Sequence, residues 1–69
     1  MVIDILVKTD NPDRLDDTVN NFGGAVVGRG VAGGYKMVDD CYVVRCFGDV
    51  GLVKFAIQNQ GCGEFIREV

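Results

Sequence analysis

A cluster of glycines around one arginine is the part of this sequence best suited to binding. Its residues are Gly28, Arg29, Gly30, Gly33, Gly34 and Tyr35. Backbone amides left bare by glycine beside a guanidinium group suit an anion or an extended peptide. The segment is neither a Walker loop, which ends in Gly-Lys-Ser/Thr, nor a dinucleotide-binding turn, which opens a helix after a strand. A bulged, strongly twisted hairpin that needs glycine for its conformation alone is the alternative, and both interpretations stay open.

Carboxylates gather where the first helix is expected to begin. They belong to Asp10, Asp13, Asp16 and Asp17. Two such groups could exchange protons with a substrate or hold a divalent cation. Capping of the helix by Asn11 and a solvated acidic face explain the same pattern without a ligand, and we favour this explanation.

Histidine is absent from the sequence, which removes the commonest general base and the commonest metal ligand. The three cysteines are Cys41, Cys46 and Cys62. Cys41 and Cys46 lie on one predicted strand and point to opposite faces, which is not the spacing of a zinc site. We interpret the thiols as small apolar side chains of the core. The sequence therefore predicts no catalytic residue, no metal and no cofactor.

The charge of the chain argues against nucleic acid as a partner. Seven basic and ten acidic residues give a net charge of −3, whereas binding to a phosphate backbone needs a basic stripe. Tyr35 and Tyr42 could stack on bases, but residues 41–47 lack the basic-glycine-aromatic pattern of RNA-recognition strands. No apolar run is long enough for a membrane span or a signal-peptide core. An odd number of cysteines fits a reducing compartment, so we expect a cytoplasmic protein that binds no membrane.

The elements that position these residues follow from hydrophobic spacing and from start and stop signals. Residues 2–9 alternate as a strand that is apolar on one face. Asn11 supplies the cap of a first helix and Gly23-Gly24 its end, while Asp49 and Gly61 do the same for a second helix. Each helix carries an apolar stripe that can cover a sheet.

Between the two helices, residues 25–47 have the pattern of a long bulged hairpin. A turn at Asp39-Asp40 separates a first strand that contains the glycines from a second strand over residues 41–47. In an alternative version the turn lies inside the glycines and adds a short extra strand. The last strand of the chain places Phe65 and Val69 on one face.

The predicted order of elements is strand, helix, strand, strand, helix, strand. Each helical crossover can return the chain to a parallel neighbour. We therefore predict a single domain over residues 1–69, of the α+β class, with the ferredoxin-like βαββαβ arrangement of a four-stranded antiparallel sheet and two helices on one face. The opposite face stays open and carries apolar and charged side chains. Because a chain of this length has a thin core, we also expect a homodimer.

The loop before the first helix resembles the corresponding loop of ACT domains. It reads Thr9-Asp10-Asn11-Pro12-Asp13-Arg14-Leu15, and the family favours an acidic or polar residue, then Pro-Gly and a helix-facing leucine. Asp13 stands here at the position of the glycine. ACT domains are small ferredoxin-like regulatory modules, usually dimeric, that bind amino acids. The resemblance implies a ligand site along the backbone of this loop.

These features lead to two hypotheses for a chain that we do not expect to be an enzyme. The first is a small protein-interaction module, an inhibitor or adaptor of the kind that viruses encode, which binds a protein partner through the open sheet face or the glycine-rich hairpin. The second is an ACT-like regulatory domain that binds an amino acid, a nucleotide or another small anion. The candidate binding residues are Asp10, Asn11, Asp13, Gly28, Arg29, Gly30, Gly33, Gly34 and Tyr35.

Overall fold

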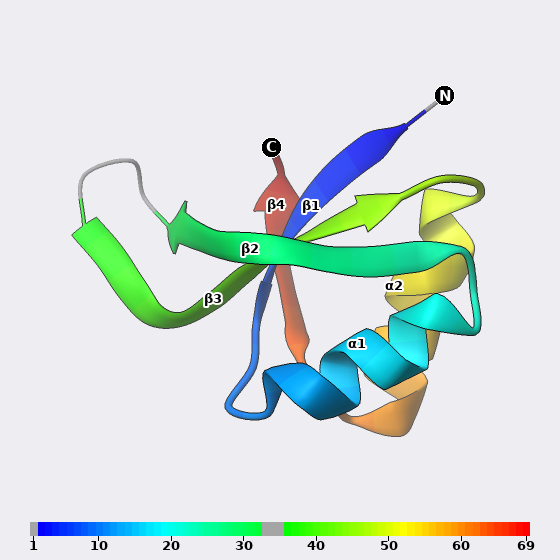
Figure 1. Cartoon of the computed structure of the whole chain (residues 1–69), viewed down its shortest axis with the longest axis horizontal. Helices are drawn as coiled ribbons and strands as arrows, with labels where there is room; N and C mark the ends of the chain where they lie inside the picture. Colours follow the sequence, from blue (N-terminus) through cyan, green and yellow to red (C-terminus); the bar gives the residue numbers. More distant parts are fainter. Residues whose placement is uncertain (1, 33–35) are drawn as a thin grey trace.

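The computed structural model describes residues 2–32 and 36–69, and it describes the side chains of residues 2–28 and 41–69. The elements are β1 (Ile3–Lys8), α1 (Pro12–Asn20), β2 (Gly24–Ala32), β3 (Lys36–Cys46), α2 (Val50–Gln60) and β4 (Glu64–Glu68) (Figure 1). The four strands form one sheet in the order β2-β3-β1-β4, and each neighbouring pair is antiparallel. This topology confirms the predicted ferredoxin-like α+β fold.

Local chemistry fixes the ends of the helices. Asn11 Oδ1 accepts a hydrogen bond from the backbone N–H of Arg14 at 3.2 Å. Asp49 Oδ1 accepts one from the N–H of Gly51 at 2.9 Å. Gly61 ends α2 in the left-handed conformation, with φ at 62°, which glycine adopts without a steric penalty. These three caps are predicted by the sequence, whereas α1 ends at Asn20, ahead of the predicted stop at Gly23-Gly24.

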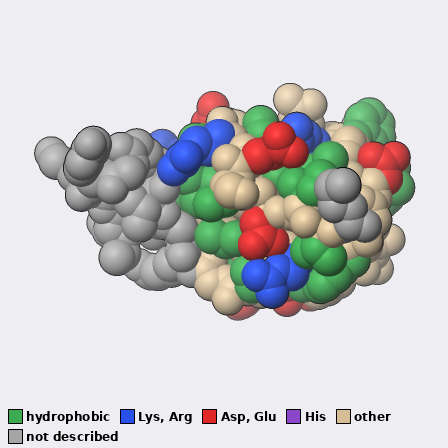
Figure 2. Space-filling view, turned by 90° about the horizontal axis from the view of Figure 1, so that it is seen from above, with side chains coloured by type: hydrophobic (Ala, Val, Ile, Leu, Met, Phe, Trp, Pro, Cys, Tyr) green, Lys and Arg blue, Asp and Glu red, His purple; other side chains and the backbone are tan. Residues whose placement is uncertain are grey.

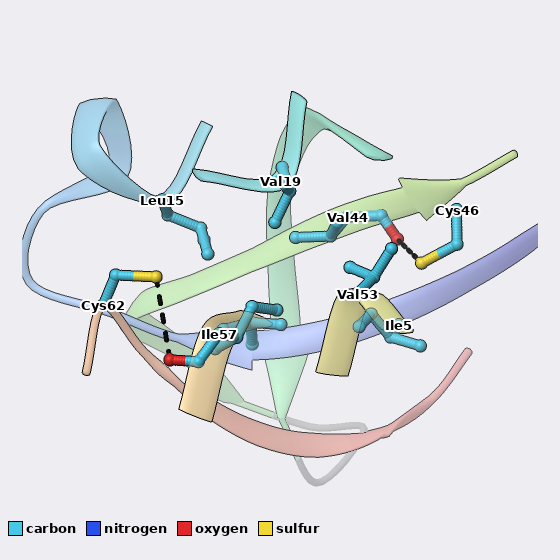
Figure 3. Close-up of a cluster of buried hydrophobic side chains, with 9 residues drawn as sticks. Ile5, Leu15, Val19, Val44, Cys46, Val53, Ile57 and Cys62 are labelled. Atoms are coloured by element: carbon cyan, nitrogen blue, oxygen red, sulfur yellow. Dashed lines mark hydrogen bonds between the residues drawn. The ribbon is translucent and has the colours of Figure 1, made fainter. Parts of the chain in front are cut away.

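Both helices cover the same face of the sheet and enclose one core. Its buried residues are Ile5, Val7, Leu15, Val19, Val44, Cys46, Val53, Ile57 and Cys62. Figure 3 shows side chains from both helices directed toward those of the central strands. Because successive side chains of a strand point to opposite faces, Asp4 and Leu6 lie on the other side of the sheet from Ile5 and Val7. We call the side away from the helices the open face.

The β2–β3 hairpin turns at a different place from the one predicted. β3 runs without interruption through Asp39 and Asp40, so the predicted turn at these residues is wrong. The pairing of Ala32 with Lys36 places the reversal between those two residues. Two consecutive acidic residues favour a turn locally, but the pairs Arg29–Tyr42 and Val31–Met37 on either side of them show that the hairpin continues past this point. The alternative turn among the glycines is closer to the structure, although no extra strand forms in the part of the hairpin that is described.

A bulge in β4 overturns the prediction for the last strand. Val7 pairs with Phe65 but Leu6 pairs with Arg67, so β4 has one extra residue between these two pairs. Strict alternation therefore fails across the bulge. Phe65 packs against the core beneath the helices, whereas Val69 follows Arg67 onto the open face. The prediction that Phe65 and Val69 share a face is wrong.

Candidate protein-interaction face

The open face carries both charged and apolar side chains on its central strands. Directly paired residues of antiparallel strands share a face, and β1 and β3 pair Asp4 with Arg45 and Leu6 with Val43. Leu6 and Cys41, which is on the same side, are both buried. The face is thus covered around these two residues and exposed toward its other end.

Asp4 and Arg45 form an ion pair on this face. Nε of Arg45 donates to Oδ1 of Asp4 at 3.0 Å, and Nη2 donates to Oδ2 at 3.2 Å. The hydrogen bond from Arg45 holds the pKa of the Asp4 carboxyl below its usual value, and the same bond raises the pKa of the guanidinium. The side chains of Arg45 and Asp4 stay 44% and 29% exposed. The pair therefore has fixed geometry and remains accessible to a partner.

A shallow hollow of about 650 Å³ lies beside this ion pair. It is lined by Val2, Ile3, Asp4, Arg45, Phe47, Glu68 and Val69. Three of these are apolar side chains in contact with water: Val2 is 54% exposed, Phe47 56% and Val69 67%. Figure 2 looks at the side of the molecule where the chain termini lie, and shows hydrophobic surface beside acidic and basic side chains. Grouping of exposed apolar residues, rather than their isolated occurrence, is what distinguishes a binding surface.

The sequence predicts an open face of mixed character but not the residues that line its hollow. None of the lining residues belongs to the predicted binding set. The alternation of β1 does signal Val2 and Asp4, because both are one position out of phase with the core residues Ile5 and Val7. Arg45 reaches Asp4 only through the register of β3. Val69 reaches the face only through the bulge in β4, for which the sequence holds no local signal.

The predicted loop residues lie near a second hollow, of about 370 Å³, which is polar in character. It is lined by Lys8, Thr9, Asp10, Gly61, Cys62, Gly63 and Glu64, from the β1–α1 and α2–β4 connections. Thr9 Oγ1 joins the two connections: it donates to the carbonyl of Cys62 at 2.7 Å and accepts from the N–H of Asn11 at 3.1 Å. Asp10 lines this hollow, whereas Asn11 caps α1 and Asp13 is exposed in its first turn.

One carboxylate of the acidic cluster has a structural role that the sequence does not predict. Asp16 Oδ1 accepts a hydrogen bond from the backbone N–H of Val26 at 3.1 Å. Since β2 is an edge strand, this bond occupies a backbone donor on its outer side. Within residues 2–28 and 41–69, whose side chains are described, no three Asp, Glu, Cys or His side chains gather closely enough to hold a metal ion.

Gly28 is the member of the glycine-rich segment whose surroundings are described. The register of the hairpin shifts between Val26 and Gly28, where the extra residue is on β2, and again between Arg29 and Val31, where the extra residues are on β3. A Cβ atom at Gly28 would meet no atom within 4 Å, and its φ is not positive. Neither space nor conformation requires glycine there. The side chain of Arg29, the surroundings of Gly30, and Gly33, Gly34 and Tyr35 lie outside the described residues.

The three cysteines are free thiols and all are buried. The Sγ atoms of Cys46 and Cys62 face the carbonyl oxygens of Val44 and Ile57 at 4.0 and 3.8 Å (Figure 3). Burial raises the pKa of the Cys46 thiol, and the negative charge of Asp4 adds to this effect. A buried neutral thiol is a poor nucleophile, so Cys46 is suited to packing rather than to chemistry.

Fold and surface together define a small ferredoxin-like domain with a partly apolar, partly charged sheet face. Comparison of the chain with protein-family models, with curated proteins and with solved structures finds no match. Among the described residues, no helix has the length and apolar character needed to cross a membrane. We therefore infer the function from the exposed side chains of the open face and of the polar hollow.

Proposed function

We propose that the protein is a small non-catalytic protein-interaction module, an inhibitor or adaptor, whose open face binds a protein. The observation that carries the proposal is the hollow beside the Asp4–Arg45 pair, with Val2, Phe47 and Val69 exposed around it. Grouped apolar side chains in water are unfavourable unless a partner covers them. Aromatic rings and arginine are also the residue types that contribute most to protein–protein affinity.

The pKa shifts of Asp4 on the open face and of Cys46 in the core support a non-catalytic role. A general base needs an accessible group whose pKa lies near the working pH, whereas Arg45 lowers the pKa of Asp4. A nucleophilic cysteine needs a stabilised thiolate, whereas burial raises the pKa of Cys46. The pKa of Asp4 is lowered and that of Cys46 is raised, and both changes are opposite to those that catalysis at neutral pH requires.

Photo-crosslinking in the cells that express the protein tests this proposal. A photoreactive phenylalanine analogue replaces Phe47 in one variant and Phe55 in the other. Phe55 is the matched control because it is 61% exposed but lies on α2, away from the open face. We expect position 47 to give covalent adducts with a protein in clear excess over position 55. Equal yields from the two positions would contradict a protein-binding role for the open face.

The polar hollow favours a second candidate function, a regulatory domain that binds a small ligand. Lys8 brings a positive charge to this hollow, and Asp10 and Glu64 bring negative charges. A zwitterion such as an amino acid could be held at both of its ends by such a set.

A thermal-shift screen of amino acids and nucleotides tests the second candidate. A ligand at 100 times its Kd should stabilise the protein by about 2.7 kcal/mol. The shift should disappear in Lys8→Gln, because the side chain that neutralises the ligand's carboxylate or phosphate is lost. A panel without any shift, or a shift that Lys8→Gln leaves unchanged, would remove this candidate.

A further inference from the structure

We infer that the protein bound at the open face is a second copy of this chain, related to the first by a two-fold axis beside the Asp4–Arg45 pair. The inference rests on the proposed function and names the partner of that same face. In a two-fold contact one surface meets itself, so the surface must be its own complement in charge and in shape. Both requirements can be examined on the residues of the hollow.

The Asp4–Arg45 pair is self-complementary in charge, and Glu68 adds one further negative charge to the lining of the hollow. A two-fold axis beside the ion pair brings Asp4 of each copy toward Arg45 of the other, which gives four charges of alternating sign. Each guanidinium has five N–H donors and each carboxylate about four acceptor sites, and the pair within one chain uses two of each. The remaining donors and acceptors are available to the second copy. Because the pair is neutral as a unit, the chains can approach here in spite of a net charge of −3 on each.

The shape of the surface is self-complementary as well. Each copy presents an exposed ring, Phe47, next to a hollow of about 650 Å³. A two-fold axis between them allows the ring of each copy to enter the hollow of the other. Val2 and Val69 then surround the charged centre and exclude water, which strengthens the ionic contacts. Desolvation of a charged pair is costly unless further partners are supplied, and the reciprocal arrangement supplies them.

The area that a dimer requires is within reach of a chain of this size. A standard interface covers about 800 Å² of each partner, which is roughly a fifth of the 4248 Å² that the chain exposes. Small domains bury a smaller fraction of their surface than large ones and are only marginally stable alone. A second copy on the open face adds buried apolar surface that the chain's own core lacks.

Sedimentation of the purified chain tests the dimer, at concentrations from about 1 μM to 1 mM, which span the affinities of weak complexes. We expect a monomer–dimer equilibrium in which Phe47→Asp raises the dissociation constant by about tenfold or more, the effect of losing a central aromatic residue. Phe55→Asp introduces the same change on an exposed ring of α2 and should leave the equilibrium unchanged. A chain that stays monomeric throughout, or an equal effect of the two substitutions, would overturn the inference.

Charge reversal tests the reciprocal pairing directly. Asp4→Arg makes the centre of the face positive, and Arg45→Asp makes it negative, so each variant alone should be monomeric because like charges meet. An equimolar mixture of the two should form a heterodimer. A mixture that stays monomeric, while circular dichroism shows both variants folded, would contradict the pairing.

The protein-binding role of the open face and the dimer can be contradicted separately. If the chain is monomeric and position 47 crosslinks a different protein, the dimer is wrong and the open face remains a protein-binding surface. If position 47 crosslinks no protein, both are wrong.

Discussion

The ion pair between Asp4 and Arg45 couples the stability of the fold to pH. The hydrogen bond from Arg45 lowers the folded-state pKa of Asp4 below the ordinary value of an aspartate carboxyl. A carboxylate with a depressed folded-state pKa stabilises the fold fully above its unfolded pKa, and that stabilisation is lost as pH falls through the folded value. We therefore expect Asp4→Asn to flatten the loss of stability below about pH 4, as measured by urea midpoints across a pH series.

A second variant controls this prediction. Arg45→Gln removes the cause of the shift but keeps the carboxylate, so its urea midpoints should flatten in the same acidic range. Curves for the wild type and Asp4→Asn that run parallel at every pH would show that the pair does not contribute.

Two glycines of the chain should respond in opposite ways to a methyl group. A Cβ atom at Gly63 would lie 2.7 Å from Cγ1 of Val7 and 3.1 Å from the carbonyl oxygen of Lys8, whereas one at Gly28 would meet no atom within 4 Å. We expect Gly63→Ala to lose about 1–3 kcal/mol through overpacking. Gly28→Ala should gain about 0.4–1 kcal/mol by restricting the unfolded chain. Urea unfolding at one fixed protein concentration measures both, and a loss at Gly28 as large as that at Gly63 would contradict the account.

At the scale of elements, one hydroxyl joins the two connections at the polar end of the sheet. Thr9 is buried and bonds both the carbonyl of Cys62 and the N–H of Asn11. Thr9→Val keeps the shape of the side chain but leaves these two backbone groups without their partner, at a cost of about 1–3 kcal/mol. Thr9→Ser keeps the hydroxyl and should lose less. Equal unfolding free energies for Thr9→Val and the wild type would show that water replaces the hydroxyl.

The ends of the elements were predictable where local chemistry decides them. Asn11, Asp49 and Gly61 act within one turn of helix, so their side chains or backbone preferences reveal the caps in the sequence alone. The turn of the hairpin was not predictable in this way. Asp39-Asp40 has the stronger local turn signal, but the pairs Val31–Met37 and Ala32–Lys36 place the reversal of the hairpin before these residues.

The candidate site was predictable as a face and not as a set of residues. The alternation of β1 and the placement of both helices define which side of the sheet is open. The position of Arg45 depends on strand register, and that of Val69 on a bulge, and both are set by the packing of the whole sheet. The hydrophobic periodicity of a single sequence does not show which residues meet when their positions depend on such long-range pairing.

At the scale of the whole molecule, the buried thiols report on opening of the fold. Cys41 lies beneath the open face, while Cys46 and Cys62 belong to the core under the helices. We expect the native protein to react slowly with a thiol reagent at all three positions, and the chain unfolded in urea to react with three equivalents at once. One fast equivalent in the native protein would contradict burial of that cysteine, and peptide mapping would identify it.

The hydrogen bond from the Val26 amide to Asp16 has a consequence for how copies of this chain can assemble. Free edge strands can add one molecule after another, and such growth has no natural limit. Helix α1 places the Asp16 carboxylate where a strand pairing with β2 would need the Val26 amide. Pairing of another strand with the β2 edge is therefore hindered at this point. Contact through the flat side of the sheet is satisfied once two molecules have met. The same short helix that shields the core thus hinders strand addition at the β2 edge, whereas the dimer that we propose through the open face is complete with two copies.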